Sequence, residues 1–148
     1  MTDPRIERMA GCWELVDATL TLPDGSVQRP WGEPPNGRII CTSAGEFSAH
    51  VSKSQRAKFA DEWPTPEEKQ TAYDDHIAYF GEIMRLDDES STMISYVRGA
   101  TNASWIGGEQ LRYIEAIDDE RFTLRAPTVT LGGLDFVARF VWARSGRR

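Results

Sequence analysis

The feature that most constrains this chain is the regular spacing of its turn sequences. Proline, glycine, aspartate and serine cluster at 23–26, 44–46, 87–90, 118–120 and 132–133. The runs between these clusters are short and rich in β-branched and aromatic residues, which favour extended strands. Short strands divided by frequent turns predict an all-β sandwich or barrel.

Eight strands are expected between these turns. Their approximate ranges are 12–22, 38–43, 47–53, 78–86, 91–99, 109–117, 121–126 and 134–144, with a ninth short strand near 127–131. The turns at 87–90 and 118–120 are short enough to join hairpins. Consecutive hairpins form a meander, and a long meander closes on itself to protect its edges. We therefore expect an antiparallel up-and-down β-barrel of eight or nine strands.

One segment departs from the strand pattern. Thr65 precedes Pro66, and Glu68 follows three positions after the threonine, which is the pattern of a helix N-cap with a capping box. Helical spacing then continues through four side chains: Tyr73, His76, Ile77 and Phe80. The pattern predicts a short helix over about 66–77, placed as a lid or plug at one end of the barrel.

Length and composition favour one soluble domain. A chain of 148 residues fits a single domain, which we place at 11–148 after an N-terminal extension at 1–10. The net charge of −6 argues against nucleic-acid binding. No apolar run approaches the length of about 18 residues expected of a membrane span. The start of the chain lacks a signal-peptide pattern, so we expect a cytoplasmic protein, with a homodimer left open.

The cysteines do not suggest a disulfide framework. Cys12 and Cys41 both lie in strand-like runs, and two cysteines allow one bridge at most. Free thiols in a reducing compartment are the expectation.

The first expected strand carries a sequence signature. Gly11-Cys12-Trp13 resembles the Gly-x-Trp signature of the lipocalins. The resemblance implies that Gly11 and Trp13 are structural, with Trp13 closing the base of a barrel. It also implies that an arginine of the last strand, Arg139 or Arg144, stacks over the Trp13 ring.

Further landmarks are similar to those of the bacterial and fungal lipocalin-like domain family, from Gly11 to Arg144. They lie at 30–40, 45–49, 79–81, 105–112, Leu124 and 141–142. Ser95 departs from the pattern, because the family often has a histidine there. The resemblance implies a ligand-binding barrel, and some related barrels act as cyclases or isomerases.

Strand alternation sorts side chains into two faces but does not say which face is inside. In 91–99, Met93, Ser95 and Val97 oppose Ile94, Tyr96 and Arg98. If Arg98 and Arg112 point inward, two guanidinium groups would favour an anionic or oxygenated ligand through forked hydrogen bonds. If they point outward, they are surface side chains on a solvated face.

Candidate site residues follow from these faces and from the resemblance. The ligand-binding candidates are Trp31, Tyr79, Tyr96, Arg98, Trp105, Arg112, Phe140 and Trp142. The catalytic candidates are His50, His76, Tyr96 and Arg98, with either histidine as a general base. The two histidines come from different elements, so no metal site is expected, and no motif indicates a cofactor.

The sequence leaves three functions open. The first is binding of a small, largely apolar ligand, lipid-like or polyketide-like, in the barrel interior. The second is a cofactor-independent cyclase or isomerase of a natural-product pathway, working by shape and a few polar groups. The third is a barrel filled by its own side chains that acts as an interaction module.

Overall fold

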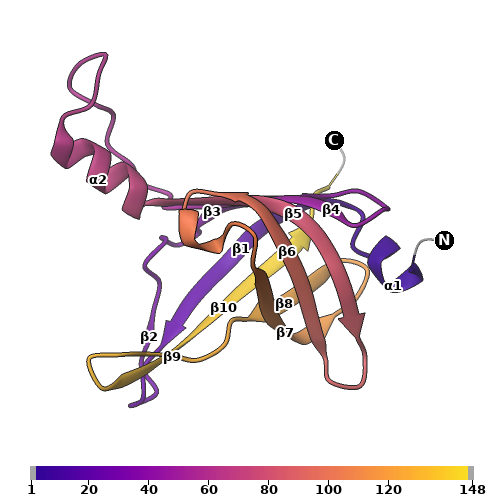
Figure 1. Cartoon of the computed structure of the whole chain (residues 1–148). Coiled ribbons are helices and arrows are strands. Elements are labelled where there is room, and N and C mark those ends of the chain that lie inside the picture. The colour runs from indigo at the N-terminus through magenta and orange to yellow at the C-terminus, as the bar shows by residue number, and fades with distance from the viewer. Residues whose placement is uncertain (1–2, 147–148) are drawn as a thin grey trace.

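The computed structural model describes residues 3–146, and most of them form a closed antiparallel β-barrel (Figure 1). Within that range, eight strands make the wall in the order β1-β3-β4-β5-β6-β7-β8-β10, and β10 pairs back with β1. Their bounds are β1 (Gly11–Thr21), β3 (Asn36–Cys41), β4 (Glu46–Ser52), β5 (His76–Asp87), β6 (Thr92–Ala100), β7 (Glu109–Ile117), β8 (Arg121–Arg125) and β10 (Leu134–Arg144). The predicted barrel is therefore confirmed.

Two short strands extend the wall. β2 (Val27–Gln28) pairs with β1, and β9 (Val129–Leu131) pairs with β10. β9 falls where the ninth strand was predicted, whereas β2 was not expected.

The strands bend into a barrel with the help of bulges. The β5–β6 ladder shifts register between Phe80 and Gly81 and again between Ile83 and Arg85. Gly81 is needed at the first shift, because a Cβ there would collide with the carbonyl oxygen of Tyr96. Such bulges increase twist and let a sheet curl onto itself.

Burial shows which face is inside. On β4, Phe47, Ala49 and Val51 are buried while His50 is exposed. On β6 the buried set is Met93, Ser95 and Val97. Ser95, the departure from the family pattern, therefore points into the barrel and is only 4% exposed.

One end of the barrel is sealed. Trp13 is 1% exposed, and its indole N–H donates to the carbonyl of Met9 at 3.0 Å. Phe122 packs edge-on against the Trp13 ring, with the centroids 4.6 Å apart. The short helix α1 (Pro4–Glu7) covers this end, and Ile6 and Met9 belong to the core (Figure 1).

The other end is flanked by helices. α2 (Pro66–Asp74) begins with the predicted capping box of Thr65 and Glu68. It ends at Asp74, short of the predicted 66–77, because His76 pairs with Ser52 and starts β5. Figure 1 shows α2 standing away from the barrel wall, so it is not the plug that the sequence suggested. The single turn η1 (Ala103–Trp105) lies closer, after β6. The helices of residues 3–146 are α1, α2 and η1. None of them is long and apolar enough to cross a membrane.

Candidate functional site

The barrel interior above the Trp13 floor contains a cavity of about 80 Å³. Its apolar wall includes Ile39, Val51, Leu124 and Phe140 from four different strands. A closed sheet points alternate side chains inward, so each strand contributes only one or two of them. The wall is therefore a product of barrel closure.

Four side chains with polar groups also border this cavity: Tyr79, Trp105, Arg112 and Trp142. Arg112 faces inward because it lies opposite the buried Met93 in the β6–β7 ladder. Trp142 lies opposite Leu15 on β1 and Phe122 on β8, both buried. The cavity is thus apolar around its sides and carries polar groups from β5, η1, β7 and β10.

The indole of Trp142 sits just above the floor. Its ring stacks on Phe122 with centroids 6.3 Å apart, and Phe122 in turn contacts Trp13. Trp142 is only 3% exposed, and its Nε1 has no hydrogen-bond partner among residues 3–146. An indole N–H is a donor only, so this buried group lacks an acceptor.

A wider hollow of about 260 Å³ lies at the open end of the barrel. Trp31, Tyr73 and His76 border it, together with Ile77 and Trp105, which also border the inner cavity. The Trp105 ring meets Tyr79 edge-on, with centroids 5.5 Å apart. Ile77 and Trp105 are therefore the side chains that stand between the mouth and the interior.

The structure corrects the placement of Tyr96 and Arg98. Both lie on the outer face of β6, because Ser95 and Val97 take the inner face. The Arg98 side chain is 60% exposed and forms an ion pair with Glu82 at 2.5 Å. Neither residue borders the cavity, and of the two arginines considered for ligand binding only Arg112 does.

The two histidines meet outside the barrel. Nδ1 of His50 lies 3.3 Å from Nε2 of His76, in a polar groove that also contains Glu14 and Arg38. Burial lowers the pKa of His76, and the nearby His50 and Arg56 lower this pKa further. His76 thus reaches the rim of the mouth, whereas His50 is turned away from the interior.

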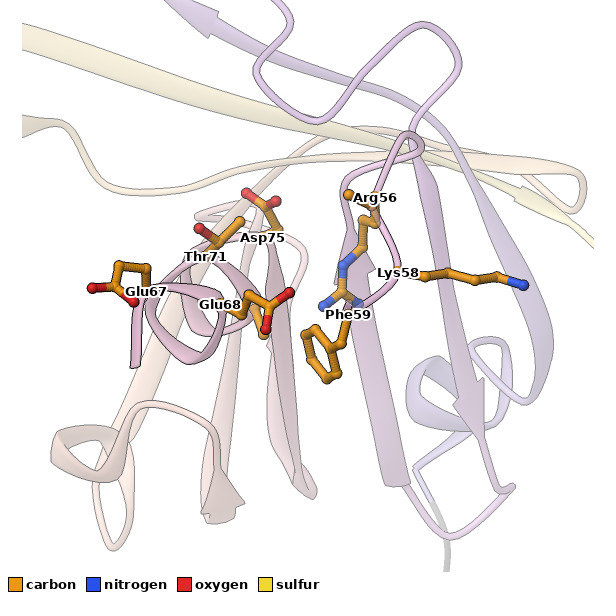
Figure 2. A pocket seen from close by; sticks show the side chains of 9 residues that line it. Arg56, Lys58, Phe59, Glu67, Glu68, Thr71 and Asp75 are labelled. Atoms are coloured by element: carbon orange, nitrogen blue, oxygen red, sulfur yellow. The ribbon is translucent and has the colours of Figure 1, made fainter. Parts of the chain in front are cut away.

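A separate hollow of about 220 Å³ lies between the loop at 56–59 and α2 (Figure 2). Glu68 faces Arg56 and Phe59 across it, while Lys58 points away. Glu68 already accepts hydrogen bonds from the backbone of Thr65 and Ala60. The carboxylate therefore serves the helix cap and the loop.

Metal binding finds no support in the described part of the chain. Residues 3–146 contain no group of three or more histidine, cysteine, aspartate or glutamate side chains placed to hold an ion.

Sequence reasoning named five residues that do border the inner cavity: Tyr79, Trp105, Arg112, Phe140 and Trp142. Trp31 borders the mouth. The reasoning missed Ile39, Val51, Ile77 and Leu124, which are ordinary aliphatic residues. Their alternation along the strands was the available signal, but it does not reveal which face is inside.

These features define a small calyx-shaped β-barrel, with a closed strand wall, one sealed end and a hollow interior. The chain belongs to the lipocalin-like domain family, whose sequence model matches residues 10–145. The resemblance seen in the sequence is thereby confirmed, and a lipocalin-like barrel suggests small-molecule binding in general.

None of the curated proteins is a significant match to the chain. Among solved structures, the chain is similar to a redesigned β-barrel with a TM-score of 0.43 and 10% sequence identity, over 96% of this chain and 95% of that one.

Proposed function

We propose that the protein binds a small, largely apolar ligand inside the barrel, admitted through the mouth beside Trp31 and Trp105. The observation that carries this proposal is the apolar cavity above the sealed floor. Ile77 and Trp105 line both this cavity and the wider hollow at the mouth. Small-molecule sites are typically concave and mostly apolar, with a few polar groups that set orientation.

The sizes of the two spaces suggest how a ligand is held. The inner cavity of about 80 Å³ is smaller than a typical ligand pocket of roughly 300 Å³ or more. A ligand that enters it therefore extends past Ile77 and Trp105 into the mouth, where 260 Å³ is open. Trp105 is the last residue of the single helical turn η1 and is part-buried, so it is the side chain we expect to move.

Catalysis as a cyclase or isomerase has weaker support. Of the four catalytic candidates, only His76 reaches the rim of the mouth, while His50, Tyr96 and Arg98 face outward. Arg112 borders the inner cavity, but it was considered for binding. A general base must come within hydrogen-bond reach of the proton that it removes. Binding without turnover is therefore the function we favour.

The neutral fluorophore N-phenyl-1-naphthylamine tests the proposal, because it is dim in water and bright in apolar surroundings. We expect saturable binding with one molecule per chain and energy transfer from the tryptophans. The Val51→Phe variant places extra volume in the cavity and should weaken binding by about tenfold or more.

The matched control is His50→Phe, which places the same phenyl ring on the outer face of the same strand, in place of the imidazole. It should leave binding unchanged. Circular dichroism and urea unfolding establish that both variants fold. Absence of saturable binding to the native protein, or equal binding to folded Val51→Phe, contradicts the proposal and favours a filled barrel.

A further inference from the structure

Two donor groups on side chains that border the inner cavity are not fully paired with acceptors. One is Nε1 of Trp142, which is buried and has no partner within residues 3–146. The other is the guanidinium of Arg112, of which Nη1 donates to the carbonyl of Leu111 at 2.8 Å. The remaining N–H groups of Arg112 form no other side-chain hydrogen bond in the described chain. Without an acceptor, the buried Nε1 of Trp142 costs free energy, and the part-buried Arg112 has further N–H groups to donate, so both side chains favour a ligand that supplies an acceptor.

The charge of Arg112 is also unbalanced. No carboxylate lies within ion-pair distance of it among residues 3–146, although the chain is acidic overall. The next acidic residue after Arg112 on β7 is Glu115. Its carboxylate forms ion pairs with Arg125 and Arg139 on the outer face. Glu109, at the start of β7, is exposed. A part-buried cation that borders an apolar cavity is stabilised when an anion or further acceptors compensate its charge.

We infer that the ligand is a small apolar molecule with one acidic oxygen group, a carboxylate in the simplest case, and that Arg112 and Trp142 bind that group. This inference rests on the proposed function, since it names the class of ligand for the same cavity. An ionised carboxylate accepts hydrogen bonds only, and guanidinium binds it with charge-assisted bonds.

The geometry sets the orientation. Trp142 packs on Phe122 directly above the floor, while Ile77 and Trp105 border the mouth. The acidic group therefore lies deep in the barrel, and the apolar body runs along Val51 and Phe140 toward Trp105. A ligand with its charge at the exposed end would leave the buried Nε1 of Trp142 unpaired and would place its charge away from Arg112.

Competition between octanoate and octan-1-ol tests the inference, because they share a chain length and differ in the charged group. Each displaces N-phenyl-1-naphthylamine from the protein at pH 7.5, where the acid is ionised. We expect octanoate to compete at roughly tenfold lower concentration or better, as charge-assisted bonding in a desolvated site predicts.

Four variants locate the preference. Arg112→Met removes the charge and keeps the apolar stem, and it should abolish the octanoate preference while fluorophore binding persists. Arg112→Lys should retain part of the preference, and Trp142→Phe should reduce it by removing the N–H. Arg98→Met is the matched control, because Arg98 lies on the outer face, and it should compete as the native protein does.

The outcomes separate the two proposals. If the fluorophore does not bind, the proposed function fails. If it binds but octanoate and octanol compete equally, or if folded Arg112→Met keeps the preference, only the acidic-ligand inference is overturned. Should Arg112→Met fail to fold, the Trp142→Phe and Arg112→Lys comparison still decides, because unchanged preference in both contradicts the inference.

Discussion

The guanidinium of Arg144 lies over the indole of Trp13, with 4.1 Å between its Cζ and the ring centroid. The same guanidinium donates to the carbonyls of Ala10 and Asp119, at 2.8 and 2.7 Å. One side chain at the end of β10 therefore joins the floor ring to the segment before β1 and to the β7–β8 turn. Arg139, the other arginine considered for this role, pairs with Glu115 instead.

Removing this arginine should destabilise the closed end. We expect Arg144→Ala to lower the free energy of unfolding by about 2–4 kcal/mol, from a lost cation–π contact and three lost hydrogen bonds, the third being a longer one to the carbonyl of Arg8. Arg144→Lys should lose less, because it keeps a charge over the ring. Urea unfolding measures both. Arg139→Ala is the control and should cost about 1 kcal/mol or less, since its ion pair is partly exposed. Equal losses for the two alanine variants would contradict the role given to Arg144.

Gly81 should resist substitution because of its backbone contact. A Cβ at this position would collide with the carbonyl oxygen of Tyr96, at a bulge that bends β5. We expect Gly81→Ala to lower the free energy of unfolding by at least about 2 kcal/mol, since backbone must shift. Gly146→Ala is the control, because nothing lies within 4 Å of a Cβ there. Thermal or urea unfolding measures the stability of both variants, and similar stabilities would count against a tight bulge.

His76 should make stability depend on pH. Burial, His50 and Arg56 lower the pKa of His76 in the folded protein. In the unfolded chain the histidine has its usual pKa of about 6.5. The unfolded state then binds more protons as the pH falls, so the stabilising contribution present above about pH 6.5 is lost below it.

The comparison of native protein with His76→Gln measures this effect. Between pH 7.5 and 5.5, the free energy of unfolding should fall more steeply for the native protein than for the variant. His50→Gln should also flatten the curve, because it removes a neighbouring charge that opposes protonation. Parallel curves for all three proteins would show that His76 is not perturbed.

The two cysteines should differ in reactivity. Burial raises the pKa of the Cys41 thiol to about 12, whereas Cys12 is only half-buried. They lie on neighbouring strands but on opposite faces, since Cys12 pairs with the exposed Ile40 and Cys41 pairs with Gly11. At pH 8 iodoacetamide should modify Cys12 and spare Cys41, because the thiolate is the nucleophile. Mass spectrometry identifies which cysteine is modified, and both cysteines should be modified when the protein is unfolded in urea. A disulfide between them, or equal labelling of the native protein, would be incompatible with this arrangement.

The course of the chain could be predicted from local signals. Turn residues at 23–26, 87–90 and 118–120 mark strand ends, and the structure has strands on either side of each. The capping box of Thr65 and Glu68 fixes where α2 begins. The predicted end of the helix at 77 was wrong, because His76 pairs with Ser52 of β4. This is a long-range interaction that helical spacing cannot reveal.

The sequence by itself thus determined the fold class, the family and the residue that forms the floor, since these follow from turns, strand alternation and the motif around Trp13. Only the tertiary structure decided which face is inside, because both faces of several strands are similarly apolar and closure selects one. That selection brought Arg112 and Trp142 to a shared cavity, and it left Arg98 in solvent and paired His50 with His76 outside. Contacts between strands distant in the chain depend on barrel register, and a one-residue shift would exchange the inner and outer sets.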